Sequence, residues 1–133
     1  MCERFHRDVL DHAPSHVIIL GGANDAYEQI HVESVGANFI AMVKLCEQHA
    51  IIPILGLPTP SLLPKEEQYL KEYRNWLQRY ADERDIMVVD FYSPFVDRIA
   101  AGQGTQLFAD EVHPSIEGYA LMGEVVVQCL KSL

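Results

Sequence analysis

The sequence predicts an α/β fold in which helices cover both faces of a parallel sheet. Three short apolar runs of the kind found in strands, at 17–20, 51–56 and 87–91, alternate with the patterns of amphipathic helices. The short connections between them predict right-handed βαβ units, which place their strands in parallel. The 133 residues are 49% hydrophobic and 22% charged, so we expect one globular domain over residues 1–133.

The first half of the chain predicts a helix, a strand, a loop, a helix and a second strand. Residues 3–12 have the spacing of a short amphipathic helix, and the run 17–20 is apolar on both faces, like a strand covered on both sides. A loop is expected over 21–31. The helix after it has one apolar face, formed by Val35, Phe39, Met42, Val43 and Cys46. Pro53, near the start of the second strand, predicts an edge position or a bulge there.

The second half predicts a long helix, a third strand and two further helices. The helix expected from about 65 to 84 carries a stripe that should face the core: Tyr69, Tyr73, Trp76, Leu77 and Tyr80. The strand 87–91 and a short helix over 94–101 follow. Pro114 is expected at the first position of the last helix. The face of that helix expected to point inward consists of Ile116, Tyr119, Ala120, Gly123 and Val127.

Charge and cysteine content exclude several classes of partner. The net charge of −9 argues against binding to nucleic acid or to an anionic membrane, because both require clustered Lys and Arg. No run approaches the roughly 18 apolar residues of a membrane span. Three cysteines without C-x-x-C spacing predict reduced thiols and a cytoplasmic location rather than disulfides or zinc. His12 and His16 lack the context of a metal site, and no cofactor or metal is implied.

The run Asp110-Glu111-Val112-His113-Pro114 is the first candidate for chemistry. A carboxylate three residues before a histidine can turn back onto the imidazole, fix its tautomer and stabilise its cation. From this run alone, a helix cap beside a surface histidine is an equally good interpretation.

The run Gly21-Gly22-Ala23-Asn24-Asp25 is the second candidate. It directly follows the first strand, at the carboxyl end where open α/β sheets bind their ligands. Taken alone, it is also compatible with an ordinary Gly-Asn-Asp turn.

Together, G-x-N-D after an early strand and D-x-x-H-P before the final helix resemble the GDSL or SGNH family of serine hydrolases. The resemblance implies a three-layer, flavodoxin-like parallel sheet, of which the last three strands are present here. It also implies hydrolysis of a small-molecule carboxylic ester by an esterase, lipase or acylhydrolase. Asp110 and His113 would be the triad acid and base, and Asn24 and Gly22 would belong to the oxyanion hole.

The family's nucleophile block is missing from this sequence, so the resemblance implies an incomplete domain. None of the six serines stands in a Gly-Asp-Ser turn, and the nucleophile is therefore unknown; Ser61, beyond a strand's carboxyl end, is a weak candidate. Ser115 is expected to be a helix cap or a surface hydroxyl. The alternatives are an inactive remnant that acts as a binding or self-assembly module, and attack by water activated at Asp110 and His113.

The first strand is expected to lie at an unprotected edge of the sheet. In the family another strand lies beside it, and an apolar edge without a neighbour invites pairing. We therefore expect the chain to form a homo-oligomer, such as a dimer, through this edge.

Overall fold

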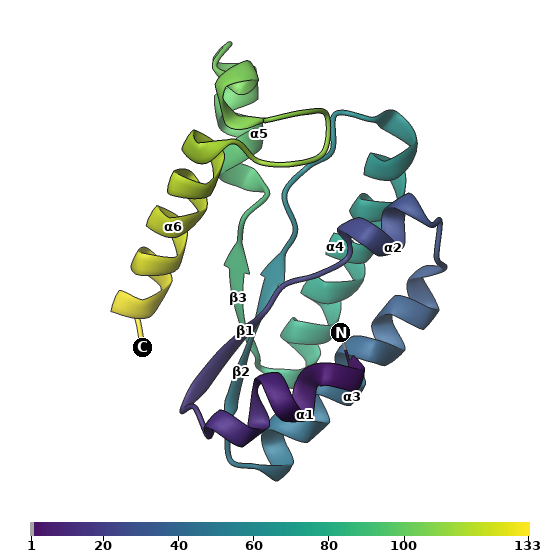
Figure 1. Ribbon diagram of the computed structural model, residues 1–133, viewed down its shortest axis with the longest axis vertical. Coiled ribbons are helices and arrows are strands. Elements are labelled where there is room, and N and C mark those ends of the chain that lie inside the picture. Colours follow the sequence, from purple (N-terminus) through teal and green to yellow (C-terminus); the bar gives the residue numbers. More distant parts are fainter. Residues whose placement is uncertain (1) are drawn as a thin grey trace.

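A computed structural model describes residues 2–133 and shows a three-stranded sheet between two layers of helices (Figure 1). The predicted thiol state of Cys2 concerns a side chain outside this description. The strands are β1 (His16–Ile19), β2 (Ile52–Leu57) and β3 (Met87–Asp90). The α-helices are α1 (Phe5–Asp8), α2 (Ala23–Tyr27), α3 (Val32–Gln48), α4 (Pro64–Arg84), α5 (Ser93–Ala100) and α6 (Ile116–Lys131). Short 3-10 helices cover Cys2–Arg4, Leu10–His12 and Gly104–Leu107.

The sheet is parallel throughout, with the strand order β1-β2-β3. This confirms the prediction of parallel strands and places β1 at an edge of the sheet. Because all three strands run in the same direction, the segments that follow them emerge at the same end of the sheet, beyond the carboxyl ends of the strands. These segments are α2 after β1, the loop 58–63 after β2, and α5 with the loop 101–115 after β3.

The prediction that Pro53 marks an edge strand or a bulge is wrong, because β2 is the central strand. Pro53 pairs in register with Val17 of β1, whereas pairing with β3 begins one residue later, at Ile54 with Met87. The N–H of Ile52 is directed to β1, where it donates to Ser15. Successive N–H groups point to opposite sides, so the N–H that proline lacks would face the side where β3 has not yet begun.

Alternating side chains of the strands belong to two different cores. In β2, Leu55 packs with α3 and α4, whereas Ile54 packs with the inner residues of α6. β1 and β3 alternate in the same way, so β1 is apolar on both faces as predicted. In Figure 1, α6 lies on one side of the sheet and α1, α3 and α4 on the other.

The predicted loop over 21–31 contains the short helix α2 instead. Gly22 has φ +119°, a conformation that favours glycine, and its carbonyl accepts the N–H of Ala26 to form the first turn. A Cβ at Gly22 would lie 3.2 Å from Cδ2 of Tyr73. Gly22 therefore allows both the turn and the close packing of this segment on α4.

The predicted inward face of α6 is also wrong. Ile116, Tyr119 and Val127 are 86%, 59% and 50% exposed. Gly118 and Leu121 are buried instead, together with the half-buried Met122, Val125, Val126 and Cys129. Both sides of this helix are apolar, so periodicity alone could not select the buried one.

The start of α6 differs from the prediction as well. The helix begins at Ile116 with Ser115 as its N-cap, so Pro114 lies just before the helix and does not occupy its first position. The Ser115 hydroxyl accepts the N–H of Gly118, which confirms the predicted capping role of Ser115.

Candidate active site

The loop that carries Asp110 and His113 is closed at its base by backbone hydrogen bonds. Phe108 and Pro114 form an isolated antiparallel bridge, and the N–H of Ala109 donates to the carbonyl of His113 over 2.8 Å. The next hydrogen bond of this ladder, farther from the turn, runs from the N–H of Ser115 to the carbonyl of Leu107 over 2.8 Å. The turn 110–113 is thus attached to a short ladder that leads directly into α6.

Within this turn, Asp110 is held by its own backbone and contacts His113 with its side chain. Oδ1 of Asp110 accepts the N–H groups of Val112 and His113 over 2.8 and 2.7 Å. Nδ1 of His113 lies 2.9 Å from Oδ2 of Asp110. An ionised carboxylate can only accept, so this contact places the ring proton on Nδ1 and leaves Nε2 as the basic nitrogen.

The electrostatics of the turn keep Asp110 ionised. The backbone N–H of Val112, then the N–H and the imidazole of His113, lower the pKa of Asp110 from 3.8 to about 2. The carboxylate is therefore charged at any pH at which His113 could act as a base. Both side chains are exposed, by 69% for His113 and 49% for Asp110, so a substrate could reach the imidazole.

Close packing against Gly118 fixes the rear of the loop. A Cβ at Gly118 would overlap the carbonyl oxygen of Leu107 and lie 2.9 Å from Cβ of Pro114. The Ser115 hydroxyl also donates to the carbonyl of Gln106 over 2.5 Å. The first turn of α6 is therefore pressed onto the two ends of the loop.

The β2–α4 loop touches the candidate site and contains Ser61. The N–H of Leu62 donates to the carbonyl of Glu111 over 2.7 Å, which joins this loop to the Asp110–His113 turn. Ser61 itself is only 7% exposed. Its hydroxyl accepts the N–H of Leu63 over 3.1 Å and lies 3.5 Å from a carboxylate oxygen of Glu66. These contacts shape the start of α4, and no hydrogen bond of the described residues joins Ser61 to His113.

An ion pair between a buried arginine and a partly buried glutamate supports the β2–α4 loop. Arg74 is only 5% exposed and pairs with Glu67, whose other oxygen accepts the N–H of Ser61 over 3.0 Å. The guanidinium also donates to the carbonyl of Pro58 over 3.4 Å and lies 3.9 Å from the ring centre of Tyr92. Arg74 thus connects the segments that follow β2 and β3.

The candidate oxyanion residues lie after β1, at the same edge of the sheet. Asn24 is exposed in the first turn of α2, whereas Gly22 is buried just before it. No hydrogen bond of the described structure occupies the Asn24 amide or joins it to Asp110 or His113. The structure therefore brings Asp110 and His113 into contact, and leaves Asn24 in α2 and Ser61 in the β2–α4 loop, both beyond the carboxyl ends of strands.

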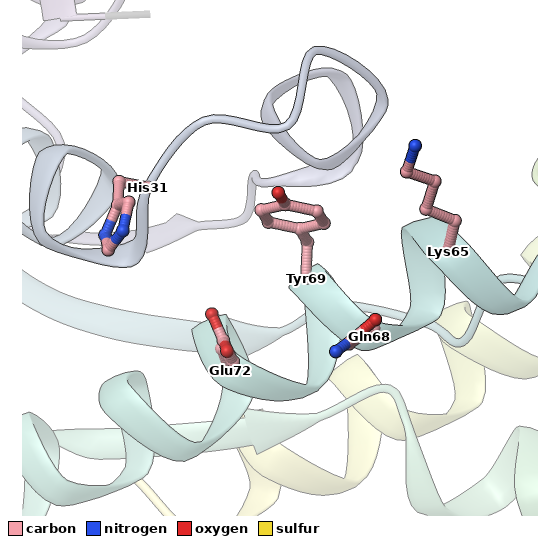
Figure 2. A pocket seen from close by; sticks show the side chains of 5 residues that line it. All are labelled: His31, Lys65, Gln68, Tyr69 and Glu72. Atoms are coloured by element: carbon pink, nitrogen blue, oxygen red, sulfur yellow. The ribbon is translucent and has the colours of Figure 1, made fainter.

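A polar pocket lies beside these loops, between the segment before α3 and the first turns of α4 (Figure 2). Its volume is about 250 Å³, and it is lined by His31, Lys65, Gln68, Tyr69 and Glu72. In Figure 2 the Tyr69 ring lies between His31 and Lys65. None of the residues predicted for catalysis lines this pocket. The sequence pattern did not predict it, because the pocket forms only where one face of α4 meets His31, which precedes α3 and is more than 30 residues away in the sequence.

Neither metal binding nor a membrane span is indicated by the part of the chain that the structure describes. Within residues 2–133, no group of three or more His, Cys, Asp or Glu side chains is placed to hold a metal ion. No helix in that range combines the length and apolar character needed to cross a membrane. Cys46 and Cys129 are free thiols, and burial raises the pKa of Cys46.

Fold and site together define an α/β protein with an Asp–His pair at the carboxyl edge of a parallel sheet. The model of the GDSL-like lipase/acylhydrolase family matches residues 1–121, and the chain belongs to this family. A comparison with curated proteins gave no match.

Solved structures of similar proteins have the same fold. A protein of the G-D-S-L family from Desulfitobacterium hafniense is 36% identical, with a TM-score of 0.84, over 96% of this chain and 72% of that one. A member of the lipolytic G-D-S-L family from Veillonella parvula is 26% identical and has a TM-score of 0.88. The match covers 100% of this chain and 74% of that one. A mutant acetylxylan esterase from Geobacillus stearothermophilus shares the fold with a TM-score of 0.84. It is 20% identical, and the match covers 96% of this chain and 64% of that one. These likenesses confirm the three-layer SGNH-type architecture.

Proposed function

We propose that this chain hydrolyses small carboxylic esters, with Asp110 and His113 as its acid–base pair. The observation that carries the proposal is the contact between Nδ1 of His113 and the ionised carboxylate of Asp110. Membership of the GDSL-like lipase/acylhydrolase family supports ester chemistry as the reaction class.

In the proposed mechanism, Nε2 of His113 removes the proton from a nucleophilic hydroxyl, whose oxygen then attacks the ester carbonyl. The carbonyl oxygen takes up the negative charge and is stabilised by the Asn24 amide and the backbone N–H of Gly22. The imidazolium, oriented and stabilised by Asp110, returns its proton to the departing alcohol. Water then repeats the sequence on the acyl intermediate and releases the carboxylic acid.

The nucleophile is the unassigned part of this mechanism. Ser61 stays a weak candidate, since it follows β2 on a loop that is hydrogen-bonded to the His113 turn. Its hydroxyl would have to leave its contacts with Leu63 and Glu66 before it could react.

Covalent labelling by a fluorophosphonate, read by intact-mass spectrometry, tests the proposal. We expect one label on the wild-type chain, no label on His113→Ala, and an unchanged label on His49→Ala. His49 is a suitable control because it is an exposed histidine whose ring nitrogen contacts the carbonyl of Leu45, at the end of α3 and away from the candidate site. Peptide mapping would then name the nucleophile, with Ser61→Ala as a direct check.

A folded wild-type chain that takes up no label would contradict catalysis by these residues alone. Equal labelling of wild type and His113→Ala would contradict the role of His113. For an active chain, hydrolysis of a short chromogenic ester should fall about 10²–10⁴-fold in Asp110→Asn, because orientation of the base is lost.

We also propose that β1 mediates self-association of a cytoplasmic protein. A shallow apolar groove of about 140 Å³ runs along this edge strand, between β1 and residues of α1, and includes Phe5, Val9 and Val17. Sedimentation at micromolar concentrations tests the proposal, and a purely monomeric chain would contradict it.

A further inference from the structure

An apolar stripe on the outer face of α6 has no partner among the described residues. Ile116, Tyr119, Val127 and Leu130 are 86%, 59%, 50% and 47% exposed. Ala120 and Gly123 are exposed between them, and no atom lies within 4 Å of the place where a Cβ of Gly123 would be. We call these six residues the outer stripe. Single exposed apolar residues are ordinary, but a continuous row of them marks an interaction surface.

The outer stripe is separate from the core face of the same helix. On that core face, Gly118 and Leu121 pack near Leu107, and Val125 packs toward β3. The stripe therefore cannot be buried by turning the helix, because the rotation would expose an equal row of core residues.

The positions of the stripe are symmetric about Gly123. Ile116 and Leu130 lie seven residues before and after it, and Tyr119 and Val127 lie four residues before and after it. An antiparallel second α6 with a two-fold axis at Gly123 would place Ile116 against Leu130 of the partner subunit. It would likewise place Tyr119 against Val127 of the partner subunit. This self-complementarity is what a two-fold interface between identical chains requires.

The small residues at the centre of the stripe favour close packing of two helices. Gly123 would meet Gly123 of the partner subunit at the axis, with Ala120 beside it. Without bulky side chains there, two backbones can approach closely, and the larger residues at both ends can interdigitate.

Charges on one flank of the stripe favour the same antiparallel arrangement. Glu117 and Lys131 are 14 residues apart, so they lie about 40° from each other around the helix and on the same side of the stripe. In the antiparallel pair, Glu117 and Lys131 of the partner subunit would be about 3 Å apart along the axis, given a rise of 1.5 Å per residue. The contact occurs twice. Glu124 would lie near its own symmetry mate at the solvated rim, where water screens the repulsion.

We infer that the outer stripe of α6 is a two-fold interface between two copies of this chain, with antiparallel helices that cross at Gly123. This surface is distinct from the edge of β1, because α6 packs on β3 at the opposite edge of the sheet. One helix pair is smaller than the roughly 800 Å² per partner of a standard interface, so the dimer should dissociate in the micromolar range.

Sedimentation equilibrium on the 133-residue chain, combined with a charge introduced into the stripe, tests this inference. Val127→Glu should raise the dissociation constant of the dimer at least about tenfold, because it places a charge among the apolar side chains of the interface. Tyr27→Glu changes another exposed aromatic residue, 75% exposed on α2, and should leave the constant unchanged. Circular dichroism confirms that each variant is folded.

The charge pair distinguishes this interface from non-specific hydrophobic contact. Glu117→Lys and Lys131→Glu should each weaken the dimer, and the double variant should restore it. A monomeric wild-type chain would overturn the inference and indicate that something other than a second copy covers the stripe. A dimer that is unaffected by Val127→Glu would overturn it in favour of another surface, such as the edge of β1.

Discussion

The substitution Gly118→Ala tests whether packing beneath the His113 turn holds the site together. The added methyl group would overlap the carbonyl oxygen of Leu107 and press on Pro114, whose Cβ would be 2.9 Å away. These two residues flank the turn of Asp110 and His113 and lie in its closing ladder. The methyl group can be accommodated only if α6 and the ladder move apart.

The size of the effect follows from three opposing contributions. Alanine is better than glycine inside a helix by about 1 kcal/mol. Overpacking costs about 1–3 kcal/mol, and loss of the hydrogen bond from Ser115 to Leu107 costs about 0.5–1.5 kcal/mol. We therefore expect Gly118→Ala to lower the free energy of unfolding by about 0.5–3.5 kcal/mol, given the sum of these ranges.

Gly123→Ala is the matched control in the same helix, because no atom lies within 4 Å of the place that its added methyl group would occupy. It should raise the free energy of unfolding by about 0.5–1 kcal/mol through helix propensity alone. Urea denaturation at a concentration where the chain is monomeric measures both variants. The reasoning is refuted if Gly118→Ala is as stable as the wild type, or if the two alanines have the same effect.

Three further predictions concern the ion pair of Glu67 with Arg74 and two shifted pKa values. Glu67→Gln should destabilise the fold by about 3 kcal/mol because it leaves Arg74 as a buried unpaired cation, and adding Arg74→Met should recover much of the loss in urea denaturation. The pKa of Asp110, about 2, should stay well below 3.8 in His113→Gln, because hydrogen bonds from backbone N–H groups are the largest cause of its lowering. Carbon NMR of the carboxyl group measures this pKa. The ionised Asp110 stabilises the fold above pH 3.8, and this contribution is lost as the pH falls through 2. Burial raises the pKa of Tyr73 from 10 to about 12. The neutral phenol therefore stabilises the fold below pH 10, and this contribution is lost as the pH rises to 12. Phenolate absorbance of the wild type, compared with that of Tyr73→Phe, measures the ionisation of Tyr73.

The features predicted correctly from the sequence depend on short-range patterns. The three strands are short β-branched runs that end in polar residues or glycine, and this pattern needs no knowledge of tertiary packing. The contact of Asp110 with His113 was predictable for the same reason, since three residues of separation allow a tight turn.

The features that could not be predicted depend on contacts between distant residues. α6 is apolar on two sides, so the packing of Gly118 on Leu107 determines which side faces the core. The periodicity of apolar residues does not reveal this contact. Arg74 and Glu67 look like an ordinary pair of charges on a long helix, although Arg74 is buried and its contacts link the segments after β2 and β3. The hydrogen bond from Leu62 to Glu111 joins two loops that are far apart in the sequence.

The tautomer of His113 tests the proposed acid–base pair most directly. Proton–nitrogen NMR of the histidine side chains, assigned with His113→Ala, reports which ring nitrogen carries the proton in the neutral imidazole. The contact with Asp110 predicts a proton on Nδ1 and a free lone pair on Nε2, and this preference should disappear in Asp110→Asn. A proton on Nε2 in the wild-type chain, or the same tautomer in both proteins, would contradict the assignment of Asp110 and His113 as the pair that activates a nucleophile.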